Sequence, residues 1–157
     1  MRRLTYLFAT LLIGGIILTC CKKNEKTVDP TPESPKIVYK VDNTGLTGNT
    51  ASDCFTYNIS YTGANGNTIT VKNVKLPWTS PEITVNLPFT AKIEGDATFN
   101  EAELPDVVYY GSIPSIDAGK YGMVSGNGAI SFKPKDLFLQ QIANNPELLQ
   151  FSLSKTF

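Results

Sequence analysis

From Ile37 to Ile93, apolar side chains recur at nearly every second position, a period typical of β-strands with one buried face. The stretch 55–61 shows it most clearly, because Phe, Tyr, Ile and Tyr alternate with Thr, Asn and Ser. The glycines and asparagines at 63–67 predict a hairpin turn, since both residue types tolerate positive φ. Further strands are predicted at 37–41, 68–76, 83–87, 89–93, 107–112 and 129–132, with a break at Pro88, which cannot donate to a ladder.

The pattern changes near the C-terminus. A proline is followed there by Phe138 and Ile142, four residues apart, which predicts a short helix over about 134–145. A second helical turn is predicted at 146–149 and a last strand at 151–157. Short strands separated by Gly- and Pro-rich turns are typical of sandwiches and barrels. We therefore expect an all-β, antiparallel β-sandwich, immunoglobulin- or transthyretin-like, with one short helical segment near the C-terminus.

The first residues of the chain have a different character. Arg2 and Arg3 precede an apolar run from Leu4 to Leu18, which is the layout of a signal peptide. The run spans about 15 residues, whereas a helix that crosses a bilayer needs about 20. A signal peptide is therefore the preferred interpretation, and a retained anchor helix is the alternative.

The end of this run resembles a lipobox, in which a cysteine becomes the first residue of the mature protein and carries the lipid. Leu18, Thr19, Cys20 and Cys21 occupy the relevant positions. We prefer Cys21 as the lipidated residue, because this choice places Leu18 three positions before the cut. Cys20 is the alternative.

A polar segment follows, KKNEKTVDPTPESP, with three prolines, charges of both signs and almost no apolar residues. Such a composition cannot bury itself and is typical of a flexible spacer. The predicted organisation is a lipoprotein signal peptide at 1–20, a flexible tether at 21–35 and a β-sandwich domain at 36–157.

The amino-acid composition excludes several classes of function. The chain has no histidine, which removes the commonest general base and the commonest transition-metal ligand. Without Arg2 and Arg3, 12 lysines face 14 acidic residues, so a net charge of −2 remains and nucleic-acid binding is not expected. We expect no enzymatic activity, no cofactor and no metal site.

The segment from Tyr61 to Trp78, with its Asn-Gly turn and its Leu76-Pro77-Trp78 ending, resembles the hairpin of the mycobacterial MmpS family. That resemblance implies a small β-sandwich outside the membrane, and similar domains occur in lipoproteins of the Bacteroidetes. MmpS proteins differ in keeping a transmembrane helix and a late cysteine pair. Their role as accessories of lipid exporters is not transferred on a shared hairpin.

Three aromatic residues are candidate ligand-binding residues: Trp78, Tyr109 and Tyr110. Trp78 either plugs one end of the sandwich or offers a stacking platform for a sugar. Neighbouring strand residues point to opposite faces, so at most one of the two tyrosines must be buried. A binding role requires at least one of the three to be exposed beside another aromatic ring.

Two further features have simpler interpretations. The acidic residues Asp96, Glu101, Glu103 and Asp106 suit a solvated loop better than a calcium site or the carboxylate pair of a glycoside hydrolase. Cys54 is expected to be an unpaired, partly buried thiol, since no histidine is available to activate it.

Together these patterns predict a membrane-tethered lipoprotein that is a non-catalytic interaction or accessory module of the cell envelope. The alternative is a carbohydrate- or lipid-binding lipoprotein that uses exposed aromatics. The expected partners are the membrane, through the N-terminal lipid, and an envelope protein. Surface lipoproteins of the Bacteroidetes often carry an acidic cluster after the cysteine, whereas Lys22 and Lys23 come first here. We therefore expect the outer membrane, facing the periplasm.

Overall fold

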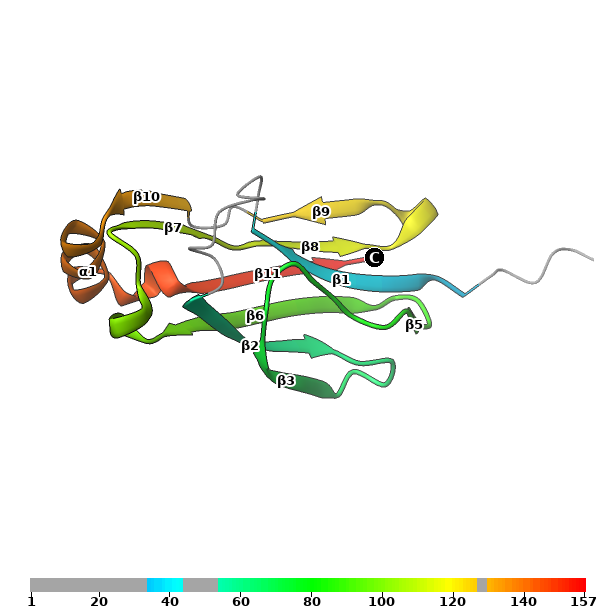
Figure 1. Cartoon of the computed structure of the whole chain (residues 1–157). Helices are drawn as coiled ribbons and strands as arrows, with labels where there is room; N and C mark the ends of the chain where they lie inside the picture. The colour runs from blue at the N-terminus through cyan, green and yellow to red at the C-terminus, as the bar shows by residue number, and fades with distance from the viewer. Residues whose placement is uncertain (1–33, 44–53, 127–129) are drawn as a thin grey trace, which may run out of the picture. The chain divides into compact units, whose positions relative to one another are not determined.

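A computed structural model describes residues 34–43, 54–126 and 130–157, which belong to one compact unit. Two antiparallel sheets face each other, and one short α-helix lies near the C-terminus (Figure 1). The expected all-β antiparallel sandwich is therefore confirmed. The proposed signal peptide, both candidate lipid cysteines and the tether as far as residue 33 lie outside the described residues.

The first sheet has the order β4-β1-β8-β9, with β5 also pairing with β1. A two-stranded ladder of β7 and β10 lies beyond it, and only Ser112 separates β7 from β8. The strands are β1 (Lys36–Asp42), β4 (Trp78–Thr79), β5 (Ile83–Thr84), β7 (Val107–Gly111), β8 (Ile113–Asp117), β9 (Met123–Ser125) and β10 (Ile130–Pro134).

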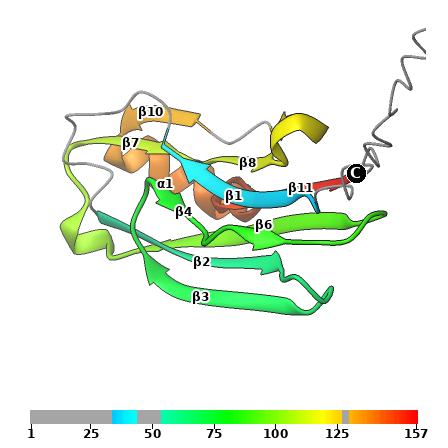
Figure 2. The same cartoon turned by 90° about the vertical axis from the view of Figure 1, so that its right-hand side faces the viewer.

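The second sheet has the order β11-β6-β2-β3 (Figure 2). The hairpin of β2 and β3 closes through the predicted turn, where the Gly63 N–H donates to the Asn67 carbonyl at 2.7 Å. The register of this ladder shifts between Tyr57 and Ile59, where the pairing is irregular. The strands are β2 (Phe55–Thr62), β3 (Thr68–Val74), β6 (Thr90–Phe99) and β11 (Gln150–Thr156).

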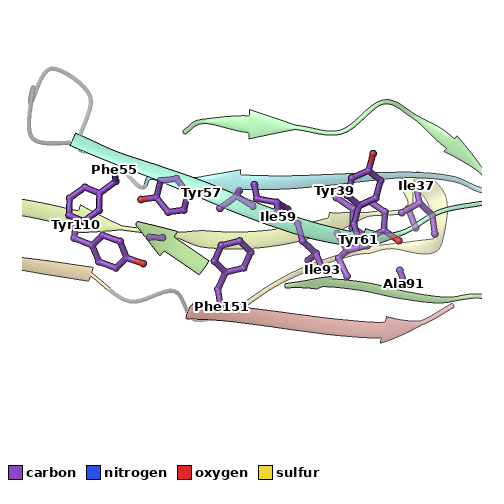
Figure 3. Packing of buried hydrophobic residues seen from close by; sticks show 14 of the residues in the cluster. Ile37, Tyr39, Phe55, Tyr57, Ile59, Tyr61, Ala91, Ile93, Tyr110 and Phe151 are labelled. Atoms are coloured by element: carbon purple, nitrogen blue, oxygen red, sulfur yellow. The ribbon is translucent and has the colours of Figure 1, made fainter. Parts of the chain in front are cut away.

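The core lies between the two sheets and is rich in aromatic rings (Figure 3). Phe55 and Tyr110 are neighbours at one end, with ring centroids 5.0 Å apart, and Tyr39 and Tyr61 are neighbours at the other, 5.1 Å apart. The alternating burial of β2 confirms that its apolar positions form the inner face of the second sheet.

The predicted helix is α1 (Lys135–Asn144), which follows β10 and closes the end of the sandwich where β7 and β10 lie. Phe138 is fully buried and contacts aromatic rings from both sides of the core. The remaining short helical elements are η2 (Glu101–Glu103), η3 (Gly119–Tyr121) and η4 (Pro146–Leu149).

The stretch 83–87 is less regular than its alternation predicts. Only Ile83–Thr84 forms a strand, although the Val85 N–H extends the contact with the chain before β1 by donating to the Pro35 carbonyl at 2.9 Å. Leu87 is exposed, and the following strand begins at Thr90, just beyond the predicted break. Pro35 is buried in this arrangement, so the folded part includes the last residue assigned to the tether.

Among the described residues, no helix is long and apolar enough to cross a membrane.

Candidate functional site

The three candidate aromatic residues have different environments. Tyr110 is buried, and its hydroxyl shares a hydrogen bond with the Ser112 hydroxyl at 3.4 Å. This burial raises the pKa of Tyr110. Trp78 is half-buried, with its ring centroid 5.5 Å from that of the buried Tyr61. Both residues therefore contribute mainly to the core, which was the simpler interpretation.

Tyr109 lies on the outside of the sandwich. It is half-buried, and its ring centroid is 4.2 Å from that of Phe132 on the paired strand β10. Phe132 retains 61% of its accessible surface, which is unusual for a phenylalanine. Tyr109 and Trp78 are both half-buried, so neither fully meets the condition of an exposed candidate beside another aromatic ring. Tyr109 comes nearer to it, because its neighbouring ring, Phe132, is exposed, whereas the neighbour of Trp78, Tyr61, is buried.

Two further apolar residues extend this pair. Val107 is directly opposite Pro134 in the ladder that pairs Tyr109 with Phe132, and both are exposed. By strand alternation these four residues share the outer face of β7 and β10. None of them is charged. We call Val107, Tyr109, Phe132 and Pro134 the distal apolar face, because they lie at the opposite end of the sandwich from residue 36, where β1 begins (Figure 1).

The outer face of the other sheet is polar throughout. Hydroxyl pairs bridge neighbouring strands at 2.9 Å, between Thr56 and Thr98 and between Ser60 and Thr70. The Asn58 amide donates to the Asp96 carboxylate at 3.1 Å. The outer face of the second sheet therefore differs sharply in chemistry from the distal apolar face of the β7–β10 ladder, and the apolar surface is the more suited to contact with another molecule.

The acidic residues do not meet in a cleft. Asp96 lies on the polar outer face of β6, whereas Glu101 and Glu103 are exposed on η2 and Asp106 is exposed just before β7. The Asn100 side chain accepts from the Ala102 N–H at 3.1 Å and so caps η2. Within the ranges described, no three Cys, Asp or Glu side chains gather as ligands for a metal ion.

Cys54 is a free, half-buried thiol, as expected. Its Sγ donates to the Glu103 carbonyl at 2.9 Å, which links the start of β2 to η2. The nearby Lys135 ammonium donates to the Glu101 carbonyl at 2.7 Å and fixes the other end of the same turn. These contacts give Cys54 a structural role.

Sequence reasoning missed Phe132 as a site residue. The sequence predicts a strand at this residue but not the strand with which it pairs, and only this pairing places Phe132 opposite Tyr109. The available signal was the alternation within 130–134, which puts Phe132 and Pro134 on the face opposite to the buried Ser131.

No known family model matches this chain, and no curated protein matches it either.

Proposed function

We propose that this protein is a lipid-anchored lipoprotein of the bacterial cell envelope, in which the β-sandwich is a non-catalytic module that binds a partner protein. The lipid is attached to Cys21, or alternatively to Cys20, after removal of the signal peptide. The polar tether then connects the membrane to the start of β1. The expected location is the outer membrane, facing the periplasm.

The observation that supports an interaction role is the distal apolar face. Tyr109 and Phe132 are aromatic residues on the outside of a strand ladder, where solvent-facing positions are ordinarily polar. Aromatic residues are enriched in the centres of protein interfaces, where a few of them supply most of the binding energy. The tether joins the opposite end of the sandwich, so this face lies far from the attachment point.

The resemblance to the MmpS hairpin stays a prediction and is not used to assign an accessory role. The chain has the expected hairpin, with β2 and β3 joined at Gly63–Asn67 and Trp78 beginning β4. A shared hairpin does not identify a partner.

The second candidate function is a carbohydrate- or lipid-binding lipoprotein, and the Tyr109–Phe132 pair is the observation that favours it. An exposed phenylalanine ring can stack on the C–H face of a sugar or on an acyl chain, and the neighbouring Tyr109 hydroxyl can donate to an oxygen. The two functions use the same surface, so they are separated by the identity of what binds there.

A crosslinking experiment tests the proposal in the producing bacterium. The photoreactive amino acid p-benzoylphenylalanine is placed at Phe132, and a matched variant carries it at Ser154, an exposed position on the other sheet. We expect a discrete protein adduct from position 132 that is absent from position 154. The Tyr109→Ser variant should reduce this adduct, because it removes the neighbouring ring.

Equal adducts from both positions, or none from position 132, would contradict the interaction proposal. A crosslink from position 132 to lipid or glycan alone would instead favour the second candidate.

A further inference from the structure

The chain enters the sandwich from the tether at the end opposite to the distal apolar face (Figure 1). Strand β1 begins there, with β5 on one side and β8 on the other. The turn η3, which follows β8, lies beside the entering chain, because residues 34–36 and 118–121 line one small hollow. Strand β11 ends here too, where Thr156 is paired with Thr90. We call residues 34–36, 63–67, 82–90, 118–123 and 155–157 the proximal end.

Large apolar side chains are exposed on both sides of the entering chain. Leu87 is exposed after β5, and Tyr121 is exposed on η3. Met123, at the start of β9, retains 66% of its accessible surface. The Lys120 ammonium lies 5.5 Å from the centre of the Tyr121 ring. Apolar residues next to tyrosine and lysine are typical of surfaces that contact the headgroup region of a membrane, where aromatic rings and long cationic side chains are both stable.

The charge of the proximal end is positive. Among its described residues, Lys36, Lys120 and Lys155 are balanced by one acidic residue, Glu82, so the side chains have a net charge of +2. Glu82 is paired with Lys36 at 2.8 Å. A positive surface of this kind is attracted to the anionic lipids of a bilayer.

The opposite end has the reverse charge. Its short elements η2, α1 and η4, with the residues beside them, carry more acidic than basic side chains within the described ranges. The acidic residues are Glu101, Glu103, Asp106, Asp136 and Glu147, and the basic ones are Lys75, Lys133 and Lys135. The sandwich is therefore polarised along its length, so an anionic surface would attract the proximal end and repel the distal one.

The proposed tether is short enough to bring the proximal end to the membrane. Twelve residues separate Cys21 from Ser34. A spacer of that length spans about 20 Å as a flexible coil and about 40 Å when fully extended. A surface held so close to its target makes contact at a high effective concentration, so weak contacts suffice.

We propose that the proximal end docks on the phospholipid surface that holds the lipid anchor. Lys120 and Lys155 lie near anionic headgroups, and Tyr121 and Met123 lie in the interfacial region. This inference rests on the proposed lipid anchor and adds an orientation to it. The distal apolar face is then held away from the bilayer, where a partner protein can reach it.

The test uses the full-length, lipidated protein, reconstituted without other proteins into vesicles of phosphatidylcholine and phosphatidylglycerol. The photoreactive amino acid p-benzoylphenylalanine is placed at Met123, and the matched variant carries it at Phe132, an equally exposed residue of the distal apolar face. Lipid adducts are measured by intact mass after illumination. The Lys120→Glu substitution is added to the Met123 variant as a test of charge. Thermal melts followed by circular dichroism check that each variant is folded.

We expect lipid adducts from position 123 and few from position 132. The yield at 123 should fall at least about threefold with Lys120→Glu, without phosphatidylglycerol, or in about 1 M salt, where the Debye length shrinks to about 3 Å. Equal yields from the two positions, or none from position 123, would overturn the inference. A yield at 123 that ignores both anionic lipid and salt would overturn the choice of an anionic surface.

These outcomes are distinct from a failure of the proposed function. The intact mass shows before illumination whether the chain carries the lipid. A chain without lipid would remove the anchor and this inference with it. A lipidated chain that gives no adduct from position 123 would overturn the docking alone.

Discussion

Replacing Phe138 by alanine should remove the ring that joins α1 to both sheets. Phe138 is fully buried, and its ring centroid lies 5.9 Å from Phe55, 5.7 Å from Phe99 and 6.3 Å from Tyr110. Phe55 and Phe99 belong to the second sheet, whereas Tyr110 belongs to β7. The lost transfer free energy and the cavity together should cost about 3–5 kcal/mol. A domain of this size has only about 5–15 kcal/mol of stability, so the loss is a large fraction of it.

The assay is urea unfolding of the compact unit Pro32–Phe157, followed by the fluorescence of the single tryptophan, Trp78. The matched control is Leu137→Ala on the same helix, because Leu137 is 49% exposed and should cost less than about 1 kcal/mol. A loss of stability below about 1 kcal/mol for Phe138→Ala, or equal losses for the two variants, would contradict this prediction. It would mean that the packing of α1 against the core contributes little to the stability of the fold.

Two further predictions concern the same core. Gly95→Ala should destabilise the fold by about 1–3 kcal/mol, because its methyl group would lie 2.5 Å from the Asn58 carbonyl oxygen; urea unfolding measures this, and an unchanged midpoint would contradict the close packing at β6. Stability should be constant up to about pH 10 and then fall toward pH 12, because burial raises the pKa of Tyr39 to about 12 and also raises that of Tyr57. Because the pKa is higher in the folded state, the phenol stays neutral in the folded protein while it ionises in the unfolded chain above pH 10. The free energy of unfolding therefore decreases by up to about 1.4 kcal/mol per pH unit for each such tyrosine. Thermal melts from pH 7 to 12 test this, and Tyr57→Phe should flatten the decline; an equally steep decline in that variant would exclude Tyr57 as a cause.

The strands of the sandwich could be predicted from the sequence wherever one face of the strand is buried and the other is exposed to solvent. The alternation in 55–61 predicted β2 closely, and the proline and the i,i+4 apolar pair predicted α1. The strand predicted at 83–87 was only partly correct, because Val85 is buried but Leu87 is exposed and only Ile83–Thr84 forms a strand. Its partner segment begins before β1, at Pro35, which no local pattern reveals.

The candidate site was only partly predictable, for a related reason. Alternation required Tyr109 and Tyr110 to face opposite ways, but it did not tell which of them is buried. The partner ring, Phe132, comes from a strand 23 positions further along the chain, and its placement depends on register. The hydrogen-bonded pair of Asn58 and Asp96 on the second sheet was not predicted either, because the two residues come together only after β2 and β6 pair.

Lipid anchoring of an envelope module is best tested by the intact mass of the protein extracted from membranes. The Cys20→Ala/Cys21→Ala double variant is measured beside it. We expect loss of about the first 20 residues, gain of a diacyl or triacyl group, and release of the double variant from the membrane. An uncleaved chain without lipid, still bound to the membrane when both cysteines are absent, would contradict the account and indicate a retained anchor helix.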